Sequence, residues 1–148
     1  MRTLTVDLFS TVDGFAKGSR SPGYFGYGGP ELDAWIHEQV AAAHVMLMGA
    51  TTYRVLSGIV APDDDPAAAR MDEVPKLVVS RSLVEPLTWP NSTLVPGDPA
   101  ETVPALKNGP GNPLRVIGSL TLVRSLLVLG LVDRLRLILF PQILGETG

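Results

Sequence analysis

The chain has 148 residues, no cysteine, two histidines and a formal net charge of −3. This length suits a single domain with a substantial hydrophobic core. The lack of cysteine excludes a disulfide framework, a thiol nucleophile and thiolate zinc sites, and the acidic balance argues against nucleic acid as a partner.

The first third of the chain predicts a strand, a long loop and a helix. Residues 3–10 alternate and are rich in β-forming residues, which is typical of a strand, and a turn follows at 12–14. An aspartate interrupts this apolar run, so the N-terminus does not look like a secretion signal. Residues 17–30 are rich in glycine and aromatic residues and predict a functional loop. Pro30 suits the first turn of a helix, whose apolar residues recur at helical spacing as far as Ala43.

The middle of the chain predicts short buried strands. "VMLMG" at 45–49 is a buried strand that ends in glycine, and a helix follows at Thr51 or Thr52. Residues 62–73 predict a solvated loop with room for one helical turn. Residues 76–81 predict another buried strand, 93–95 a short one, and 99–107 a short helix.

The last third repeats the pattern of strand, glycine and helix. "LRVIGS" is the strand, 120–129 the helix with Gly130 as its C-cap, and 135–140 a final strand. Charged residues, glycine and proline interrupt 120–144, which excludes a membrane span. We therefore expect a soluble, cytoplasmic α/β domain with a largely parallel sheet and helices on both faces.

Small and polar residues follow three of the predicted strands. They are Gly49, Ala50, Thr51 and Thr52; Ser80 and Arg81; and Gly118, Ser119, Leu120 and Thr121. Ligands of open α/β sheets bind beyond the carboxyl ends of the strands, and helix N-termini there attract phosphate. Two such helix ends beside an arginine predict a cradle for dinucleotide phosphates.

Each of these features also has an ordinary structural interpretation. Ser119, Thr51 and Thr52 are good helix caps, and an arginine after a strand is commonly solvated. The chain contains neither GxGxxG after its first strand nor GxxxxGK[ST], so it has neither a Rossmann fingerprint nor a P-loop.

Few residues suit acid–base chemistry. The candidates are Asp13, Glu31, Asp33 and His37, although Asp13 also suits a turn and the two residues near Pro30 also suit a helix N-terminus. We expect no metal site, since the acidic run at 63–65 is typical of a solvated loop, and no nucleophile pair.

Four motifs, in order, resemble the dihydrofolate reductase-like superfamily. They are "TVDLFSTVDGFA", "MLMGATTY", "KLVVSRSL" and "LRVIGSLTLVRSLLVLGLVDRLRLILFPQILG". The chain is most similar to stand-alone relatives of the reductase domain of the riboflavin-biosynthesis protein RibD. The resemblance implies a single reductase domain over 1–148 with a mixed, mostly parallel sheet. It also implies NADPH-dependent hydride transfer to a small heterocyclic substrate, such as a ribosylamino-pyrimidine.

The resemblance also assigns roles to residues. Gly49, Thr51 and Thr52 would line the cofactor phosphates, and Ser80 and Arg81 would meet the 2′-phosphate. Gly118, Ser119, Leu120 and Thr121 would hold the pyrophosphate and the nicotinamide ribose. Asp13 and the loop around Tyr27 would border the nicotinamide and substrate, and Asp33 would be the substrate-binding carboxylate of the first helix.

The chain departs from its relatives at three points. Ala50 stands where an arginine is common, which leaves Arg81 as the cation that selects NADPH over NADH. The zinc-dependent deaminase half of RibD is absent. A C-terminal hairpin is also absent, so that 135–140 would be an edge strand that is truncated or pairs with another chain, as in a homodimer. Two alternatives remain open: a non-catalytic nucleotide-binding or regulatory module, and a flavin-using reductase.

Overall fold

The computed structural model describes residues 1–17, 23–59 and 64–145, which include a six-stranded sheet in the order β4-β3-β2-β5-β1-β6. All five of its strand pairings are parallel. The strands are β1 (Leu4–Thr11), β2 (Val45–Gly49), β3 (Lys76–Val79), β4 (Ser92–Val95), β5 (Leu114–Val116) and β6 (Arg134–Phe140). Because all the strands are parallel to their neighbours, their carboxyl ends share one edge of the sheet.

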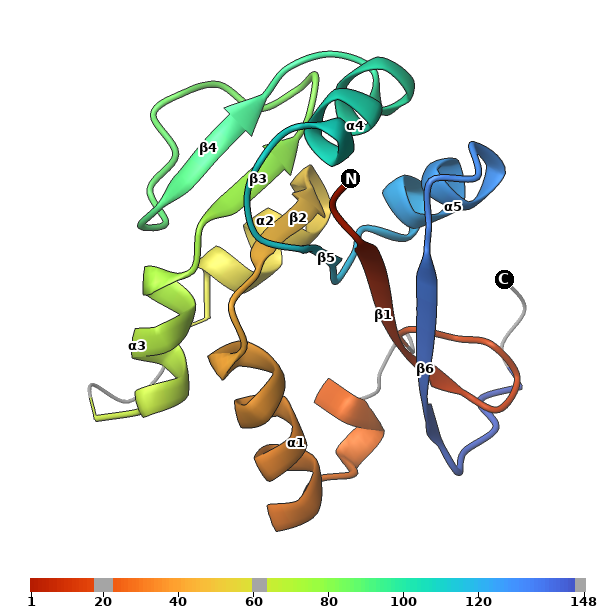
Figure 1. The fold of residues 1–148 in the computed structure, drawn as a ribbon. Helices are drawn as coiled ribbons and strands as arrows, with labels where there is room; N and C mark the ends of the chain where they lie inside the picture. Colours follow the sequence, from red (N-terminus) through yellow and green to blue (C-terminus); the bar gives the residue numbers. More distant parts are fainter. Residues whose placement is uncertain (18–22, 60–63, 146–148) are drawn as a thin grey trace.

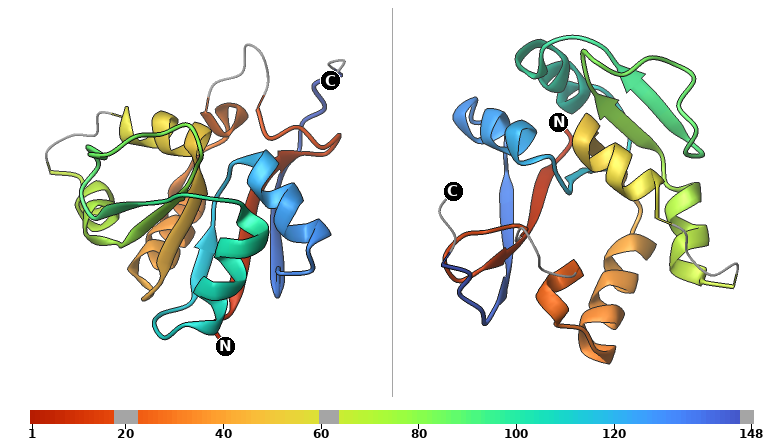
Figure 2. Two further views of the ribbon diagram at one scale, coloured as in Figure 1. Left: turned by 90° about the horizontal axis from the view of Figure 1, so that it is seen from above. Right: turned by 180° about the vertical axis from the view of Figure 1, so that it is seen from behind.

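Helices cover both faces of this sheet, as Figures 1 and 2 show. One face carries α4 (Pro99–Asn108) and α5 (Leu120–Val128), and the other carries α1 (Pro30–Ala41), α2 (Ala50–Ser57) and α3 (Pro66–Glu73). A short 3-10 turn, η1 (Gly23–Gly26), precedes α1. No helix in the described part of the chain is long and apolar enough to cross a membrane.

The two faces have separate cores, and the alternation along β2 shows how the sequence divides them. Leu47 packs with Leu114 under α4 and α5, whereas Met46 and Met48 pack with Tyr53 under α2 and α3. Side chains of a strand point alternately to opposite faces, so a continuous apolar run such as "VMLM" supplies both cores. This arrangement confirms the α/β fold class and the helices on both faces. The resemblance implied a mixed, mostly parallel sheet, whereas all the strand pairings of the described residues are parallel.

Residues 66–73 differ most from the sequence-based expectation. They form the two-turn helix α3, where the sequence analysis expected a loop with a single turn. Asp65 is its N-cap and accepts a hydrogen bond from the Ala67 N–H at 2.9 Å, while Pro66 occupies the first turn. The acidic run thus ends in a helix cap, because one aspartate of the run satisfies a free backbone amide.

Candidate nucleotide and substrate site

The N-termini of α2 and α5 lie side by side at the carboxyl edge of the sheet. The Gly49 N–H donates to the Gly118 carbonyl oxygen at 3.2 Å, which joins the end of β2 to the segment after β5. A Cβ atom built on Gly49 would lie 2.5 Å from Ser119 Oγ, and one built on Gly118 would collide with Thr52 Oγ1. A side chain at either position would therefore force its neighbour to shift, and glycine allows the two helix ends to approach this closely.

The two helix ends differ in how their backbone amides are satisfied. The N-cap of α2 is Gly49, which has no side chain to offer, so neither Thr51 nor Thr52 is the cap residue. The N-cap of α5 is Ser119, whose Oγ accepts a long hydrogen bond of 3.4 Å from the Leu122 N–H. The capping interpretation of Ser119 is thus confirmed, while α2 presents amides that no capping side chain covers.

A cavity of about 350 Å³, which we call the helix-end cavity, lies against these termini. It is lined by most of the residues that the sequence analysis assigned to the cofactor: Thr51, Thr52, Gly118, Ser119, Leu120 and Thr121. Lys17, from the segment after β1, is the one cation among its described lining residues. Backbone amides, two helix dipoles and an ammonium group together favour an anion there.

Ser80 and Arg81 lie outside this cavity, at the carboxyl end of the neighbouring strand β3. The Ser80 side chain is buried, and its Oγ accepts hydrogen bonds from the Ser82 and Leu83 N–H groups at 3.1 Å. Arg81 is exposed. Arg54 of α2 reaches the same turn, with its Nη2 3.5 Å from Ser82 Oγ, so two arginines flank this end of the sheet.

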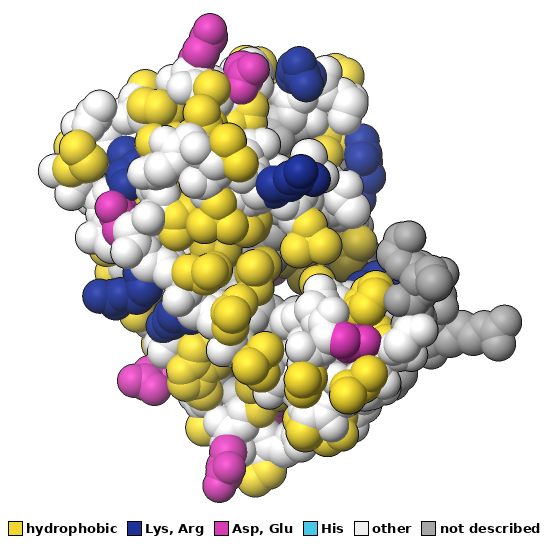
Figure 3. Space-filling view, turned by 90° about the vertical axis from the view of Figure 1, so that its right-hand side faces the viewer, with side chains coloured by type: hydrophobic (Ala, Val, Ile, Leu, Met, Phe, Trp, Pro, Cys, Tyr) yellow, Lys and Arg dark blue, Asp and Glu magenta, His cyan; other side chains and the backbone are white. Residues whose placement is uncertain are grey.

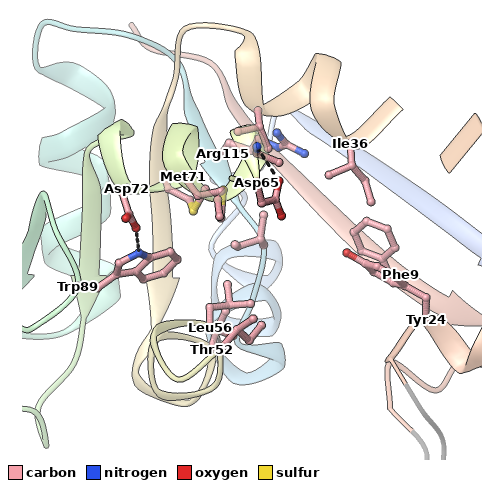
Figure 4. Close-up of a pocket in the computed structure, with 16 residues that line it drawn as sticks. Phe9, Tyr24, Ile36, Thr52, Leu56, Asp65, Met71, Asp72, Trp89 and Arg115 are labelled. Atoms are coloured by element: carbon pink, nitrogen blue, oxygen red, sulfur yellow. Dashed lines mark hydrogen bonds between the residues drawn. The ribbon is translucent and has the colours of Figure 1, made fainter. Parts of the chain in front are cut away.

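A second cavity of about 480 Å³, the central cavity, lies between α1, α3 and the sheet (Figure 4). Its walls are largely apolar and include Ile36, Met46 and Met71. Phe9, Thr52 and Ile117 line both cavities, so molecules that occupied the two would meet at this shared wall.

A buried ionic cluster lies beneath the two cavities. The side chain of Asp7 in β1 is fully buried and accepts hydrogen bonds from Arg115 of β5 and from Arg136 of β6. The Arg136 guanidinium also donates to Gln39 Oε1 at 2.5 Å and lies 5.3 Å from the Trp35 ring centre. Asp7 lines the helix-end cavity and Arg115 the central cavity, so the cluster belongs to the candidate site.

Asp13 lies apart from both cavities. Its carboxylate accepts hydrogen bonds from the Gly145 and Leu144 N–H groups at 3.0 and 3.1 Å, and from Thr11 Oγ1 at 2.7 Å. The Gly145 amide, followed by the Thr11 hydroxyl, lowers the pKa of Asp13 below its ordinary value. The side chain thereby ties the segment after β6 to the turn after β1, and its catalytic role stays a prediction.

Asp33 is exposed on α1 and is not among the lining residues of either cavity. Its charge, together with desolvation as the larger cause, raises the pKa of Tyr24, whose ring lines the central cavity. Tyr27 donates from its phenol to the Pro141 carbonyl oxygen at 3.2 Å and packs beside Phe140. The predicted role of Asp33 as a substrate-binding carboxylate also stays a prediction.

Asp7, Arg115 and Lys17 belong to the site but were not among the predicted site residues. A usable signal existed for the first two, since each is a charged residue inside a short buried strand, where a charge persists only with a partner. Their pairing required the parallel register of β1 and β5, which sets Thr5 beside Arg115. Lys17 sits in a glycine-rich segment without periodicity, and no local pattern singles it out.

Three of the solved structures with the same fold illustrate the likeness. A pyrimidine reductase-like protein from Corynebacterium diphtheriae is 18% identical, with a TM-score of 0.66 over 97% of this chain and 76% of that chain. A protein attributed to riboflavin biosynthesis from Shewanella sp. PV-4 is 21% identical, with a TM-score of 0.67 over 97% and 79%. Dihydrofolate reductase from Enterococcus faecalis, complexed with NADP(H) and RAB-propyl, is 10% identical, with a TM-score of 0.64 over 95% and 72%.

These likenesses show that the chain has a dihydrofolate reductase-like α/β fold. A search among curated proteins gave no significant match. The sequence model of the RibD C-terminal domain family matches residues 2–148. The chain therefore belongs to the RibD C-terminal domain family, as the four motifs predicted.

Proposed function

We propose that this chain is an NADPH-dependent reductase that transfers hydride to a small heterocyclic substrate such as a ribosylamino-pyrimidine. One observation carries the proposal: the helix-end cavity and the central cavity share the wall formed by Phe9, Thr52 and Ile117. Hydride transfer needs the donor carbon and the acceptor carbon in contact and shielded from water. Two adjoining cavities, one suited to phosphates and one largely apolar, meet that need.

The residues of the helix-end cavity fit a dinucleotide. Gly49 and Gly118 keep the helix ends free of Cβ atoms that would displace their neighbours, and the amides of α2 carry no capping side chain. The pyrophosphate would lie against these amides and Lys17, and the adenosine end would extend past Arg54 toward Arg81. When bound, reduced nicotinamide supplies the hydride.

The chain would contribute orientation and electrostatics to the reaction. Thr52 and Ile117 would hold the substrate against the nicotinamide, and the apolar walls of the central cavity would exclude water from all but one side of it. Among the described lining residues, the carboxylates are Asp7, which is paired with two arginines, and Asp65 and Asp72, which accept hydrogen bonds from Ala67 and Trp89. We therefore propose water as the proton donor.

The assembly that we propose is a homodimer through the side of the molecule formed by α5 and β6. Figure 3 shows hydrophobic side chains gathered on this side of the molecule. The exposed apolar residues of these two elements include Leu135, Leu137 and Leu139 of β6 and Val128 of α5. β6 pairs with β1 on one side only, among the residues that the structure describes. A second copy would cover both the apolar surface and the unpaired strand edge.

The proposal is tested by titrating the protein with NADPH and NADH and then measuring turnover. Binding is followed through nucleotide fluorescence, and turnover through loss of reduced-nicotinamide absorbance with a panel of pyrimidines, pterins and ribosylamines. We expect binding of NADPH and turnover with at least one panel member. Binding without turnover would favour the non-catalytic module, a yellow protein as purified would favour a flavin enzyme, and absence of nucleotide binding would overturn the proposal.

A further inference from the structure

The central cavity contains a guanidinium group with spare hydrogen-bond donors. The Nε of Arg115 donates to Asp7 Oδ2 at 2.5 Å, and the side chain is only 11% exposed. Its two terminal nitrogens have no acceptor among residues 1–17, 23–59 and 64–145. A guanidinium has five N–H donors, so four of them remain for water or a ligand of the cavity that Arg115 lines.

The buried ionic cluster of Asp7, Arg115 and Arg136 carries more positive charge than its one carboxylate balances. Asp7 is shared between Arg115 and Arg136, which leaves two guanidinium groups against one carboxylate. Arg136 also donates to Gln39 and lies over Trp35, so its donors are largely used. An anion beside Arg115 would balance the second guanidinium charge, which Asp7 alone does not neutralise.

The other acidic side chains of the central cavity are engaged elsewhere. Asp65 caps α3 through the Ala67 N–H, and Asp72 Oδ1 accepts a hydrogen bond from Trp89 Nε1 at 2.8 Å. Figure 4 shows Asp72 and Trp89 together on one side of the cavity, away from Arg115. Neither carboxylate forms an ion pair with Arg115 among the described residues, so the terminal nitrogens of Arg115 stay open to a ligand.

We propose that the substrate of the central cavity carries a carboxylate, bound by the terminal nitrogens of Arg115, on a body of one or two rings. The planar guanidinium fork matches a carboxylate through two parallel hydrogen bonds. The cavity of about 480 Å³ lies in the range of small-molecule sites, and its apolar walls suit a ring. This inference rests on the proposed function, which makes the central cavity the substrate site.

Arg115 also lies close in the sequence to the wall that the two cavities share. It precedes Ile117 by two residues, and Ile117, which follows the end of β5, belongs to that wall. One short segment therefore supplies both the guanidinium group and part of the wall beside the helix-end cavity.

The test measures binding of matched acids and amides to the nucleotide-free protein by calorimetry. The probe pairs are benzoate and benzamide, cinnamate and cinnamamide, and indole-2-carboxylate and its amide; phenyl phosphate is added as a tetrahedral anion. We expect at least one carboxylate to bind about tenfold or more tightly than its amide, as a charge-assisted hydrogen-bond pair implies. No preference in any pair, or tighter binding of phenyl phosphate than of every carboxylate, would overturn the inference.

Variants test whether the preference for carboxylates over amides depends on the Arg115 side chain. Arg115→Gln should abolish it, whereas Arg124→Gln, which removes an exposed arginine of α5, should leave it intact. If Arg115→Gln does not fold, Arg115→Lys retains the charge beside Asp7 and loses the fork, and should reduce the preference about threefold or more. An unchanged preference in the folded Arg115 variant would contradict the assignment.

The same titrations separate this inference from the proposed function. NADPH binding depends on the helix-end cavity and is measured independently. A carboxylate preference without NADPH binding would leave a carboxylate site on a protein that is not this kind of reductase. NADPH turnover without a carboxylate preference would overturn the carboxylate inference and leave the proposed reductase function standing.

Discussion

Gly49 and Ser119 are packed so closely that the N-termini of α2 and α5 form one continuous surface. A Cβ atom on Gly49 would lie 2.5 Å from Ser119 Oγ, while the backbone of Gly49 has a negative φ that alanine can adopt. The contact, and not the backbone conformation, therefore requires glycine at this position.

Replacing Gly49 with alanine should displace the Ser119 side chain, which would then lose the capping hydrogen bond that its Oγ accepts from the Leu122 N–H. We expect the free energy of unfolding to fall by about 1 kcal/mol and the Kd for NADPH to rise. Chemical denaturation and nucleotide titration measure both. Gly28→Ala, where a Cβ would meet nothing within 4 Å, is the control. The double variant Gly49→Ala/Ser119→Gly should recover nucleotide binding, and an unaffected single variant would contradict the packing argument.

Arg81→Ala should raise the KM for NADPH at least about tenfold more than the KM for NADH. The reason is that a guanidinium near the 2′-phosphate acts only on the phosphorylated cofactor. Arg54→Ala should shift the ratio in the same direction, because Arg54 reaches the turn that follows Arg81. Steady-state kinetics with both cofactors provide the measurement. Equal effects on the two cofactors would argue against a 2′-phosphate site at this end of the sheet.

Lys17→Ala should weaken the binding of NADPH and of NADH to a similar extent, with a rise in each Kd of roughly tenfold or less at low salt. Lys17 lines the helix-end cavity and would face the pyrophosphate that both cofactors share. Fluorescence titrations at several salt concentrations should show a shallower salt dependence for the variant than for the parent chain. Arg124→Ala supplies the control for loss of a surface cation. Selective weakening of NADPH would place Lys17 at the 2′-phosphate instead.

Stability should decline as the pH falls below 6.5 because of His44. Burial lowers the pKa of His44 from its ordinary value of 6.5. Its Nδ1 contacts the Ala42 carbonyl oxygen at 2.6 Å, and its buried Nε2 has no hydrogen-bond partner among the residues that the structure describes. Below pH 6.5 the unfolded chain therefore binds a proton at His44 more readily than the folded chain does. As a result, the free energy of unfolding decreases as the pH is lowered. The slope is at most about 1.4 kcal/mol per pH unit for one such group.

Denaturation between pH 7 and pH 5 measures this slope. His44→Gln should flatten it, and His37→Gln, on the exposed face of α1, should not. Asp13 and Asp133 have pKa values lowered from 3.8, by the Gly145 amide and the Lys107 ammonium respectively, so both lose their stabilising charge only at lower pH. Equal slopes in the parent chain and His44→Gln would show that other groups control the transition.

Leu137→Asp should convert the proposed dimer into a monomer. Leu137 is 55% exposed in the centre of the apolar surface on β6, where a buried carboxylate would disfavour association. Light scattering coupled to size exclusion gives the molecular mass. Val84→Asp, at an exposed apolar position after β3, should leave the mass unchanged. If the parent chain stays monomeric at a protein concentration of tens of micromolar, the homodimer proposal is wrong.

Several parts of the fold follow from local sequence because their patterns are strong. The runs at 45–49 and 135–140 are short, apolar and bounded by glycine or proline, and both are strands. The C-cap of α5 is Leu129, one residue before the predicted Gly130, which follows it with a φ of 67°. The helix at 66–73 was underestimated, because its signal is a single capping aspartate and a proline beside an acidic run.

Some of the predicted site residues line the helix-end cavity and others lie outside it, for a physical reason. Thr51, Thr52 and the residues from Gly118 to Thr121 come together because α2 and α5 begin at the ends of neighbouring strands. Ser80 folds back onto its own turn, and Asp13 binds the segment after β6, because nearby backbone amides compete for their oxygen atoms. Local sequence cannot predict which acceptor a buried amide will use.

The sequence by itself determined the alternation of strands and helices, the family, and the small residues at the strand ends, since each depends on neighbours along the chain. Only the tertiary structure decided that Asp7 of β1 faces Arg115 and Arg136, and that two cavities share a wall at Phe9, Thr52 and Ile117. The two ion pairs of Asp7 join residues 108 and 129 positions apart, and both the ion pairs and the shared wall depend on strand order and register. Strand order is set by how the helices bury both faces of the whole sheet, which no single segment encodes.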